Sequence, residues 1–323
     1  FSLQDGEIYG LVGETGCGKT VSGLSLLRLL PRSAVIPHGE ILFEGVNLLA
    51  LSRRHIEDLR GNKIAMIFQD PSTSLNPVFS IGSQIERVVR QHMRVNHREA
   101  RGKALQVLEA VGLPDVERIM NSYPHQLSGG MQQRVMIAMA LSCNPRLLIA
   151  DEPTTSLDVT IQAQILKLLR DLQKRFSISV IIITHNLGVI AQTCDRLAVL
   201  YGGRVVERGS TRDIFTHPHH PYTRGLMNAI PRPDGRGKRM ATIHGTVPSN
   251  PGVMPGCTFA PRCEFAMDLC TLDKPPLFQV GDDSEPVGKE QKEKEGGDHG
   301  CVLFGEVFAG QYRAPLPVVN KPD

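Results

Sequence analysis

Short, unbroken runs of apolar residues recur along the first two thirds of the chain, and each is followed by polar or glycine-rich residues. Runs of this length, bounded by turn-forming residues, are typical of strands buried in the core of a sheet. Between them, apolar residues recur at every third or fourth position, which is the spacing of a helix with one buried face. The pattern therefore predicts an α/β fold. The predicted strands span residues 8–12, 39–45, 63–68, 147–152, 180–185, 197–201 and 204–207, and the last two form a hairpin.

The pattern changes between residues 76 and 126. Residues 84–89 and 104–111 have helical spacing, and no strand-like run interrupts them. Together with the helix that follows, this stretch predicts a helical insertion in the α/β core over residues 76–140.

Composition and the first residues suggest how the chain is organised. Proline, histidine and glycine become frequent near residue 216. We therefore predict one domain over residues 1–215 and a loop-rich C-terminal extension over residues 216–323. The chain begins with Phe1, and residues 1–7 resemble a strand and a turn that lead into the strand at 8–12. We therefore expect a fragment that lacks some N-terminal residues.

The residues after the first predicted strand read G-x-x-x-x-G-K-[ST], and a helix with apolar Leu24, Leu27 and Leu30 follows them. A glycine-rich loop between a strand and a helix directs successive N–H groups at a phosphate, and the helix N-terminus adds positive partial charge. A glycine-rich turn that binds nothing is the alternative, but the complete motif in this context favours a nucleotide. Lys19 is expected to reach the β- and γ-phosphates, and the Thr20 hydroxyl to bind Mg²⁺. The predicted binding residues are Gly13, Glu14, Thr15, Gly16, Cys17, Gly18, Lys19 and Thr20.

Polar side chains follow three later predicted strands at the point where each strand ends. They are Gln69, the adjacent Asp151 and Glu152, and His185. Ligands of α/β sheets bind at the carboxyl ends of the strands, so Asp151 is suited to the Mg²⁺ shell and Glu152 to activating a water molecule. The alternative is a set of polar strand ends, and a lone histidine is more often structural. Because His185 shares this edge with Gln69 and Glu152, we favour a γ-phosphate role for it.

A second glycine-containing stretch spans residues 127–134 and precedes a helical pattern. Ser128 is a good N-cap residue, and Gly129 and Gly130 lie beside the helix N-terminus. This arrangement predicts a second anion site, although alone it would be an ordinary helix cap.

Composition narrows the classes of protein. The chain has 323 residues, of which 41% are hydrophobic, so a sizeable core is expected. The formal net charge of +3 is weak evidence for nucleic-acid binding. No apolar run approaches the roughly 20 residues that span a bilayer, and no secretory signal is present. ATP chemistry without an export signal indicates the cytoplasm.

These motifs together resemble the nucleotide-binding subunit of an ATP-binding-cassette (ABC) transporter over residues 1–230. The stretch Leu-Ser-Gly-Gly-Met-Gln at 127–132 resembles the signature of that family. The resemblance implies a P-loop NTPase cassette that uses ATP and Mg²⁺, in which two cassettes enclose two ATP molecules head to tail. Ser128, Gly129 and Gly130 would then face the ATP of the partner cassette. The resemblance also implies roles for single residues: Gln69 near Mg²⁺ and the permease, Glu152 as catalytic base, Asp158 in the D-loop and His185 as the switch histidine.

Three further stretches resemble the peptide and nickel importers within that family. They are Asp70–Pro77, His220–Thr223, and Gly256–Cys263 with the later Cys270. This resemblance implies an oligopeptide or dipeptide importer ATPase, with nickel or another small solute as the alternative. It also implies a second ATPase subunit, identical or homologous, two transmembrane permease subunits, an external solute-binding protein and a peripheral place on the cytoplasmic face of the inner membrane. The aromatic residue that stacks on adenine in this family would lie upstream of Phe1.

Four of the seven cysteines gather near the end of the chain. In a reducing compartment such a group suggests metal binding rather than disulfides. Four thiolates fit an iron–sulfur cluster or tetrahedral Zn²⁺, and zinc sites more often show C-x-x-C pairs, which these cysteines lack. The resemblance favours a [4Fe–4S] cluster, while zinc and no metal stay open. The candidate ligands are Cys257, Cys263, Cys270 and Cys301, with His299 as a spare.

Two other classes of protein are less consistent with the sequence. A DNA-repair or chromosome ATPase of the cassette type would show long coiled coils, two cassettes or C-x-x-C pairs, and its charge would favour a phosphate backbone. A regulatory cassette without hydrolysis would have lost part of its machinery, whereas Lys19, Glu152 and His185 are all present.

Overall fold

The chain forms two compact units, Phe1–Leu200 (unit 1) and Tyr201–Asp323 (unit 2). The domain boundary predicted near residue 215 stays a prediction. The computed structural model describes residues 1–155, 157–230, 243–248, 251–279 and 298–299.

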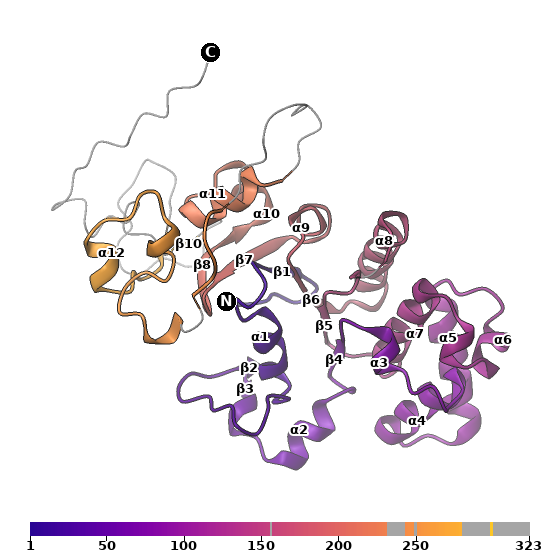
Figure 1. The fold of residues 1–323 in the computed structure, drawn as a ribbon. Helices are drawn as coiled ribbons and strands as arrows, with labels where there is room; N and C mark the ends of the chain where they lie inside the picture. Colours follow the sequence, from indigo (N-terminus) through magenta and orange to yellow (C-terminus); the bar gives the residue numbers. More distant parts are fainter. Residues whose placement is uncertain (156, 231–242, 249–250, 280–297, 300–323) are drawn as a thin grey trace. The chain divides into compact units, whose positions relative to one another are not determined.

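The core of unit 1 is a parallel sheet with the strand order β4-β5-β6-β1-β7 (Figure 1). The residues of β1, β5 and β6 are all buried, which explains their unbroken apolar sequences. The predicted α/β class is therefore confirmed. The strands are β1 (Ile8–Val12), β4 (Ile64–Ile67), β5 (Leu147–Asp151), β6 (Ser179–Thr184) and β7 (Arg196–Tyr201).

The strand register brings three chain segments to one edge of this sheet. Val12 of β1 pairs with Thr184 of β6, and Asp151 of β5 pairs with Ile183. The residues after these strands therefore leave the sheet side by side at its carboxyl edge. In α/β sheets this edge is where ligands bind.

Helices α3 to α7 follow one another without an intervening strand and gather beside the β4 side of the sheet (Figure 1). The predicted helical insertion is present, and its helices α4, α5, α6 and α7 pack on one another. Local signals fix where single helices of the insertion begin. At the start of α5, for example, Asn96 and Glu99 form a reciprocal capping box. The helices of unit 1 are α1 (Lys19–Leu26), α2 (Arg53–Leu59), α3 (Pro71–Ser74), α4 (Ile81–Met93), α5 (His97–Ala110), α6 (Val116–Asn121), α7 (Gly129–Leu141), α8 (Val159–Phe176) and α9 (Leu187–Thr193), with single 3₁₀ turns at Leu48–Ala50 and Pro124–Gln126.

Three local predictions were wrong. Residues 1–3 form no strand; instead the Phe1 ring stacks on Tyr9 with 5.1 Å between ring centroids. Helix α1 ends before Leu30, because Arg28 adopts a left-handed φ of 49°. The strand predicted at 39–45 shrinks to β2 (Leu42–Phe43), which pairs with β3 (Val46–Asn47) in a separate two-stranded sheet.

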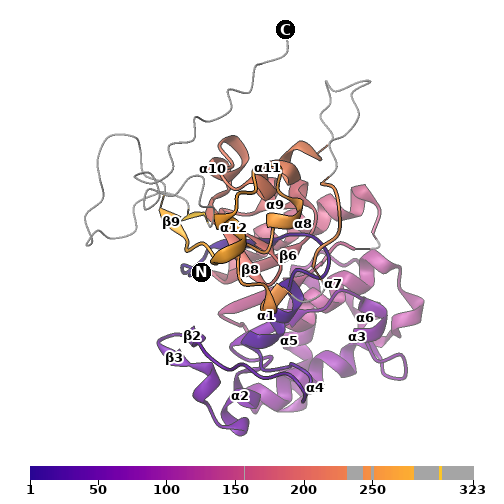
Figure 2. The ribbon, with the colours of Figure 1, turned by 60° about the vertical axis from the view of Figure 1, so that its left-hand side comes forward.

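Unit 2 has its own small core, built on aromatic side chains. The Tyr201 ring contacts Tyr222 and Phe259, with centroid distances of 4.6 and 5.1 Å, and Tyr222 and Phe259 are 5.4 Å apart. Figure 2 shows α10 and α11 next to each other in this unit. Its elements are β8 (Arg204–Ser210), α10 (Thr211–Thr216), α11 (Pro221–Asn228), α12 (Leu269–Leu272), β9 (Phe278–Gln279) and β10 (Asp298–His299), with 3₁₀ turns at Pro251–Val253 and Ala260–Arg262.

Candidate nucleotide site

The predicted phosphate loop, residues 13–20, connects β1 to α1. Its glycines are required by geometry: a Cβ on Gly13 would lie 2.2 Å from the Leu200 carbonyl oxygen, and Gly16 and Gly18 have φ values of 84° and 101°. A Cβ on Gly16 would meet no atom within 4 Å, so the loop opens onto free space there. The loop has the shape that a phosphate group needs for a close approach to the backbone.

Lys19 is 6% exposed, and its ammonium group lies against the loop. It donates to the carbonyl oxygens of Gly13 and Glu14 at 2.8 and 3.0 Å. The side chain of Cys17, which belongs to the loop, is fully buried, and burial raises the pKa of its thiol. Cys17 can therefore contribute only its backbone to a ligand.

Thr20 and Asp151 lie together although 131 residues separate them in the sequence. The Thr20 hydroxyl donates to Asp151 Oδ1 at 3.1 Å. Burial raises the pKa of Asp151, and the nearby Glu152 carboxylate raises it too, while the Thr20 hydrogen bond and the charge of Lys19 act in the opposite direction. A hydroxyl beside a buried carboxylate is a hard oxygen donor set of the kind that Mg²⁺ prefers.

Glu152 follows β5 directly, and its carboxylate accepts hydrogen bonds from three chain segments. Gln69 Nε2 and Thr155 Oγ1 donate to Oε2 at 3.1 and 2.8 Å. The ring nitrogen His185 Nδ1 lies 2.9 Å from Oε1. Burial opposes ionisation of Glu152, but the hydrogen bonds from His185 and Thr155 and the positive charge of His185 and Lys19 lower its pKa overall. The structure thus brings Gln69, Glu152 and His185 together, as their place at strand ends suggested.

The second group of predicted residues lies at the start of two helices. Ser128 Oγ caps α7 by accepting from Met131 N at 3.4 Å, and Asp158 Oδ1 caps α8 by accepting from Ile161 N at 3.0 Å. A Cβ on Gly130 would lie 3.1 Å from Ile161 Cγ2, so the two helix starts are neighbours. Among the described residues, no hydrogen bond joins Ser128 or Asp158 to the phosphate loop. These residues therefore form a group of their own.

Sequence reasoning missed Thr155. Its hydroxyl makes the shortest of the hydrogen bonds to the Glu152 carboxylate, and it comes from the same turn. A threonine three residues after a carboxylate at a strand end was the available signal, since short hydroxyl side chains often bond within turns.

The C-terminal cysteines are only partly described. Cys257 N donates to the Cys270 carbonyl oxygen at 2.7 Å, and Cys270 is buried. Burial raises the pKa of Cys263 to about 11 and also raises that of Cys257. In the part of the chain that the structure describes, no group of three or more His, Cys, Asp or Glu side chains could hold a metal ion. Cys301 lies outside the described residues, so the predicted set of four ligands is not complete there.

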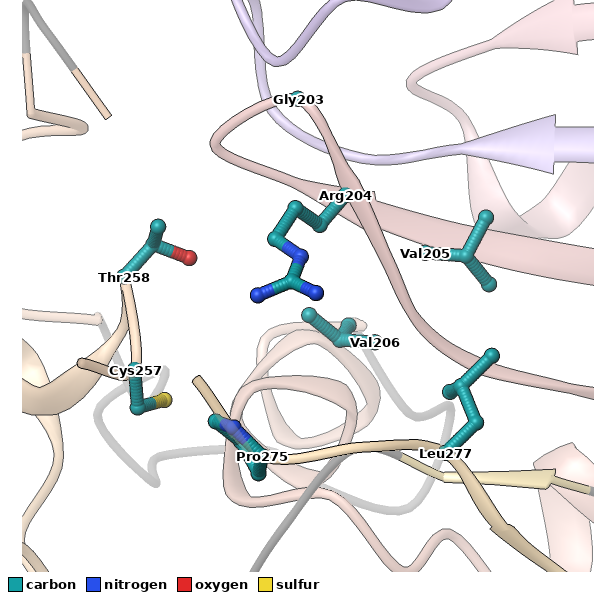
Figure 3. Close-up of a pocket in the computed structure, with 8 residues that line it drawn as sticks. All are labelled: Gly203, Arg204, Val205, Val206, Cys257, Thr258, Pro275 and Leu277. Carbon is teal, nitrogen blue, oxygen red and sulfur yellow. The ribbon is translucent and has the colours of Figure 1, made fainter. Parts of the chain in front are cut away.

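Unit 2 also contains a cavity of about 290 Å³. Figure 3 shows the Arg204 guanidinium pointing into it, between Cys257, Thr258 and Pro275. Its lining residues include none of those predicted to bind nucleotide. They are Gly203, Arg204, Val205, Val206, Cys257, Thr258, Pro275 and Leu277.

The parallel sheet, phosphate loop and strand-end carboxylates define unit 1 as a P-loop cassette. Comparison with known proteins agrees: the family described as "ABC transporter" matches residues 1–155, and "Oligopeptide/dipeptide transporter, C-terminal region" matches residues 206–270. A solved structure of the ATP-binding cassette MJ0796 in a dimeric post-hydrolysis state with ADP and Pi is similar, with a TM-score of 0.58 and 29% identity. That likeness covers 66% of this chain and 88% of the other.

Similar curated proteins cover most of the chain. The probable peptide ABC transporter ATP-binding protein y4tR of Sinorhizobium fredii is 55% identical over 87% of this chain and 84% of its own length. The oligopeptide transport ATP-binding protein AppD and the dipeptide transport ATP-binding protein DppD of Bacillus subtilis are both 49% identical. They match over 86% and 84% of this chain, and over 85% and 81% of their own lengths. The chain therefore belongs to the family of ABC transporter ATP-binding proteins with an oligopeptide/dipeptide-type C-terminal region. No helix in the described ranges is both long and apolar enough to cross a bilayer.

Proposed function

We propose that the chain is the ATP-hydrolysing subunit of a membrane ABC transporter that imports peptides. The observation that carries the proposal is the Glu152 carboxylate, which Gln69 and His185 contact from neighbouring strand ends beside the Thr20–Asp151 pair. The peptide substrate is supported by the C-terminal region and by the names of the similar proteins. Nickel or another small solute is the alternative substrate.

The phosphate loop supplies binding and charge neutralisation. Backbone N–H groups of residues 13–20 would hold the phosphates, and Lys19 would leave its two carbonyl partners to bind them. Thr20, Asp151 and Gln69 would hold Mg²⁺, which when bound neutralises negative charge on the phosphate oxygens. The Thr20–Asp151 pair fits this role because both donors are oxygen atoms already within hydrogen-bond distance.

Glu152 would act as the general base. Its lowered pKa keeps the carboxylate ionised at neutral pH, so it can accept a proton from the attacking water. His185 would contact the γ-phosphate. Since its side chain is 56% exposed, it can turn towards a ligand without disturbing the core.

A second cassette would complete the site. Ser128, Gly129 and Gly130 present a capped helix N-terminus, and Asp158 lies beside it, yet the described hydrogen bonds of this group do not join it to the loop of its own chain. We therefore assign this group to the nucleotide of a partner cassette, identical or homologous. Two permease subunits, an external solute-binding protein and a peripheral position on the cytoplasmic face of the membrane complete the proposed assembly.

A metal bound by the C-terminal cysteines is a separate proposal. The three described cysteines do not form a metal site by themselves, so any [4Fe–4S] cluster or Zn²⁺ would also need Cys301 or another ligand. Elemental analysis of anaerobically purified protein decides this point. About four irons per chain supports a cluster, stoichiometric zinc without iron replaces it, and neither metal removes the proposal.

The proposed function is tested by E152Q in the purified chain. Glutamine keeps the shape of the side chain but cannot accept a proton, so ATP binding should persist while turnover falls about 10²- to 10⁴-fold. The control is E57Q, which removes a carboxylate that is 49% exposed on α2 and should leave turnover unchanged. Near-normal turnover in E152Q would contradict the assignment of the base.

A further inference from the structure

The turn that follows β5 holds Glu152 to Thr155 by two hydrogen bonds. Thr155 N donates to the Glu152 carbonyl oxygen at 3.1 Å, and Thr155 Oγ1 donates to the carboxylate oxygen Oε2 at 2.8 Å. Backbone and side chain of one residue are therefore tied to backbone and side chain of the other.

Building on the proposed function, we propose that Thr155 is a positioning residue that fixes the orientation of the Glu152 carboxylate for its work as general base. Neither the comparisons nor the motifs assign this residue a role.

Among the residues that the structure describes, three side chains contact the Glu152 carboxylate, and one of them belongs to its own turn. Gln69 and His185 follow β4 and β6, and the proposed function requires both to contact other groups when ATP is bound. Thr155 has no such second task, and its bond spans only three residues. Thr155 is therefore the partner that can hold Oε2 throughout the cycle, leaving Oε1 to face the water once His185 turns away.

The side-chain chemistry of threonine suits this task. A β-branched side chain has few χ1 rotamers, so its hydroxyl points in a defined direction. A hydroxyl that donates to a carboxylate also favours the ionised form, which a general base must have.

The backbone adds a reason why such a tether is needed. Glu152 has a left-handed φ of 46°, which is unfavourable for a residue with a side chain. Its own N–H donates to Ile183 O at 2.8 Å, which anchors one side of the residue to β6. The bonds to Thr155 anchor the other side.

The test compares T155V with T155S in the full-length purified chain. Valine has nearly the shape of threonine but no hydroxyl, and serine retains the hydroxyl. We expect T155V to lower kcat about 10- to 100-fold, as for loss of a hydrogen bond to a charged group, with KM for ATP within about 2-fold. T155S should keep kcat within about 3-fold of wild type. T216V, which removes a hydroxyl bonded to a backbone carbonyl in α10, is the matched control.

The separate values of kcat and KM distinguish positioning from mere structure. A positioning role predicts that T155V loses kcat at an unchanged KM for ATP and that the hydroxyl of T155S restores it, whereas a merely structural role predicts no selective loss of kcat. An equal loss in T155V and T155S, or a wild-type kcat in T155V, would overturn the proposal. If T155V does not fold, as judged by its nucleotide affinity and thermal unfolding, T155A is measured against T155S by the same two criteria.

The two proposals fail in distinguishable ways. If E152Q abolishes turnover but T155V retains the wild-type rate, Thr155 has no positioning role and the base assignment stands. If E152Q itself retains turnover, the proposed function fails first, and the role of Thr155 fails with it.

Discussion

Glu152 occupies a backbone conformation that most residues avoid. A left-handed φ in a non-glycine residue costs about 1–2 kcal/mol, and glycine would relieve it. Glycine cannot supply a carboxylate, however, and Gln69, Thr155 and His185 all contact this one. We interpret the strain as the consequence of placing the proposed base immediately after a buried strand, where the chain must turn sharply.

Glu207 offers a residue-scale prediction about pH. It is 2% exposed, and burial raises its pKa above the ordinary value of 4.5, although the N–H groups of His219 and His220 donate to it at 2.8 and 3.0 Å. Between pH 4.5 and the raised pKa, the folded chain binds the Glu207 proton more tightly than the unfolded chain does. This contribution to the free energy of unfolding is therefore full below pH 4.5 and falls as the pH rises through the raised pKa.

Glutamine at this position cannot titrate, so the E207Q variant should lack that fall. Urea unfolding between pH 4.5 and 8 measures the free energy of unfolding of both proteins, and the difference should shift in favour of E207Q as the pH rises. The exposed E109Q on α5 serves as the control. Parallel curves for E207Q and wild type would show that Glu207 has an ordinary pKa.

The site residues differ in how far the sequence could predict them. Asp151, Glu152 and His185 were identifiable because each ends or follows a run that only a buried strand would have. The bond from Gln69 to Glu152 spans 83 residues and depends on the order of β4, β5 and β6, which one sequence does not determine. Thr155 could not be singled out with certainty, because its contact depends on the χ1 angle of one side chain.

Helix α1 packs on the sheet through a glycine. A Cβ on Gly23 would lie 2.8 Å from Ile183 Cδ1 and 3.4 Å from Ile149 Cγ2, so even one methyl group must displace its neighbours. This close contact fixes the helix that carries Lys19 and Thr20.

G23A should therefore destabilise the chain by about 1–3 kcal/mol, since overpacking forces side chains and backbone to shift. G102A in α5 is the matched control, because a Cβ there meets no atom within 4 Å, and it should stabilise by about 0.5–1 kcal/mol. Thermal or urea unfolding gives both values. Equal effects of the two variants would mean that α1 does not pack on β5 and β6 as described.

The second predicted anion-binding site lies at the first turn of helix α7. Replacing its N-cap in S128R puts a long cation where the proposed assembly has a partner's nucleotide. ATP-dependent dimerisation should be lost, while nucleotide affinity of the single chain stays within about 3-fold, since Lys19 and Thr20 are untouched. S128A removes only the cap and should cost about 0.5–2 kcal/mol of stability. Loss of nucleotide affinity in S128R with dimerisation intact would contradict the assignment to a partner cassette.

Strands were predicted correctly from the sequence where burial on both faces restricts the residues to apolar types. Strands β1, β5 and β6 are covered on both faces, so their sequences carry an unmistakable apolar run. Prediction failed at residues 1–3 and 39–45, where short apolar stretches lie outside the main sheet and other contacts decide their structure. The end of α1 was also missed, because Arg28 in a left-handed conformation gives no sequence signal of the kind that glycine gives.

At the scale of the whole molecule, each of the two units has a core of its own. Unit 1 combines the parallel sheet with every residue proposed for ATP binding and hydrolysis. Unit 2 combines an aromatic core with Arg262, which donates to the Ile243 and His244 carbonyl oxygens at 3.1 and 2.8 Å. We expect loss of the C-terminal cysteines to affect unit 2 and to leave ATP hydrolysis by unit 1 largely intact.

The most direct test is uptake of a labelled peptide by cells of the source organism from which the gene for this chain has been deleted. Deletion should abolish uptake, wild-type chain should restore it, and E152Q, produced at the same level, should not. Labelled nickel, measured in parallel, should enter all strains equally. Peptide uptake that survives the deletion, or that E152Q restores, would contradict the account, and nickel uptake that follows the wild-type chain instead would replace peptides as the transported substrate.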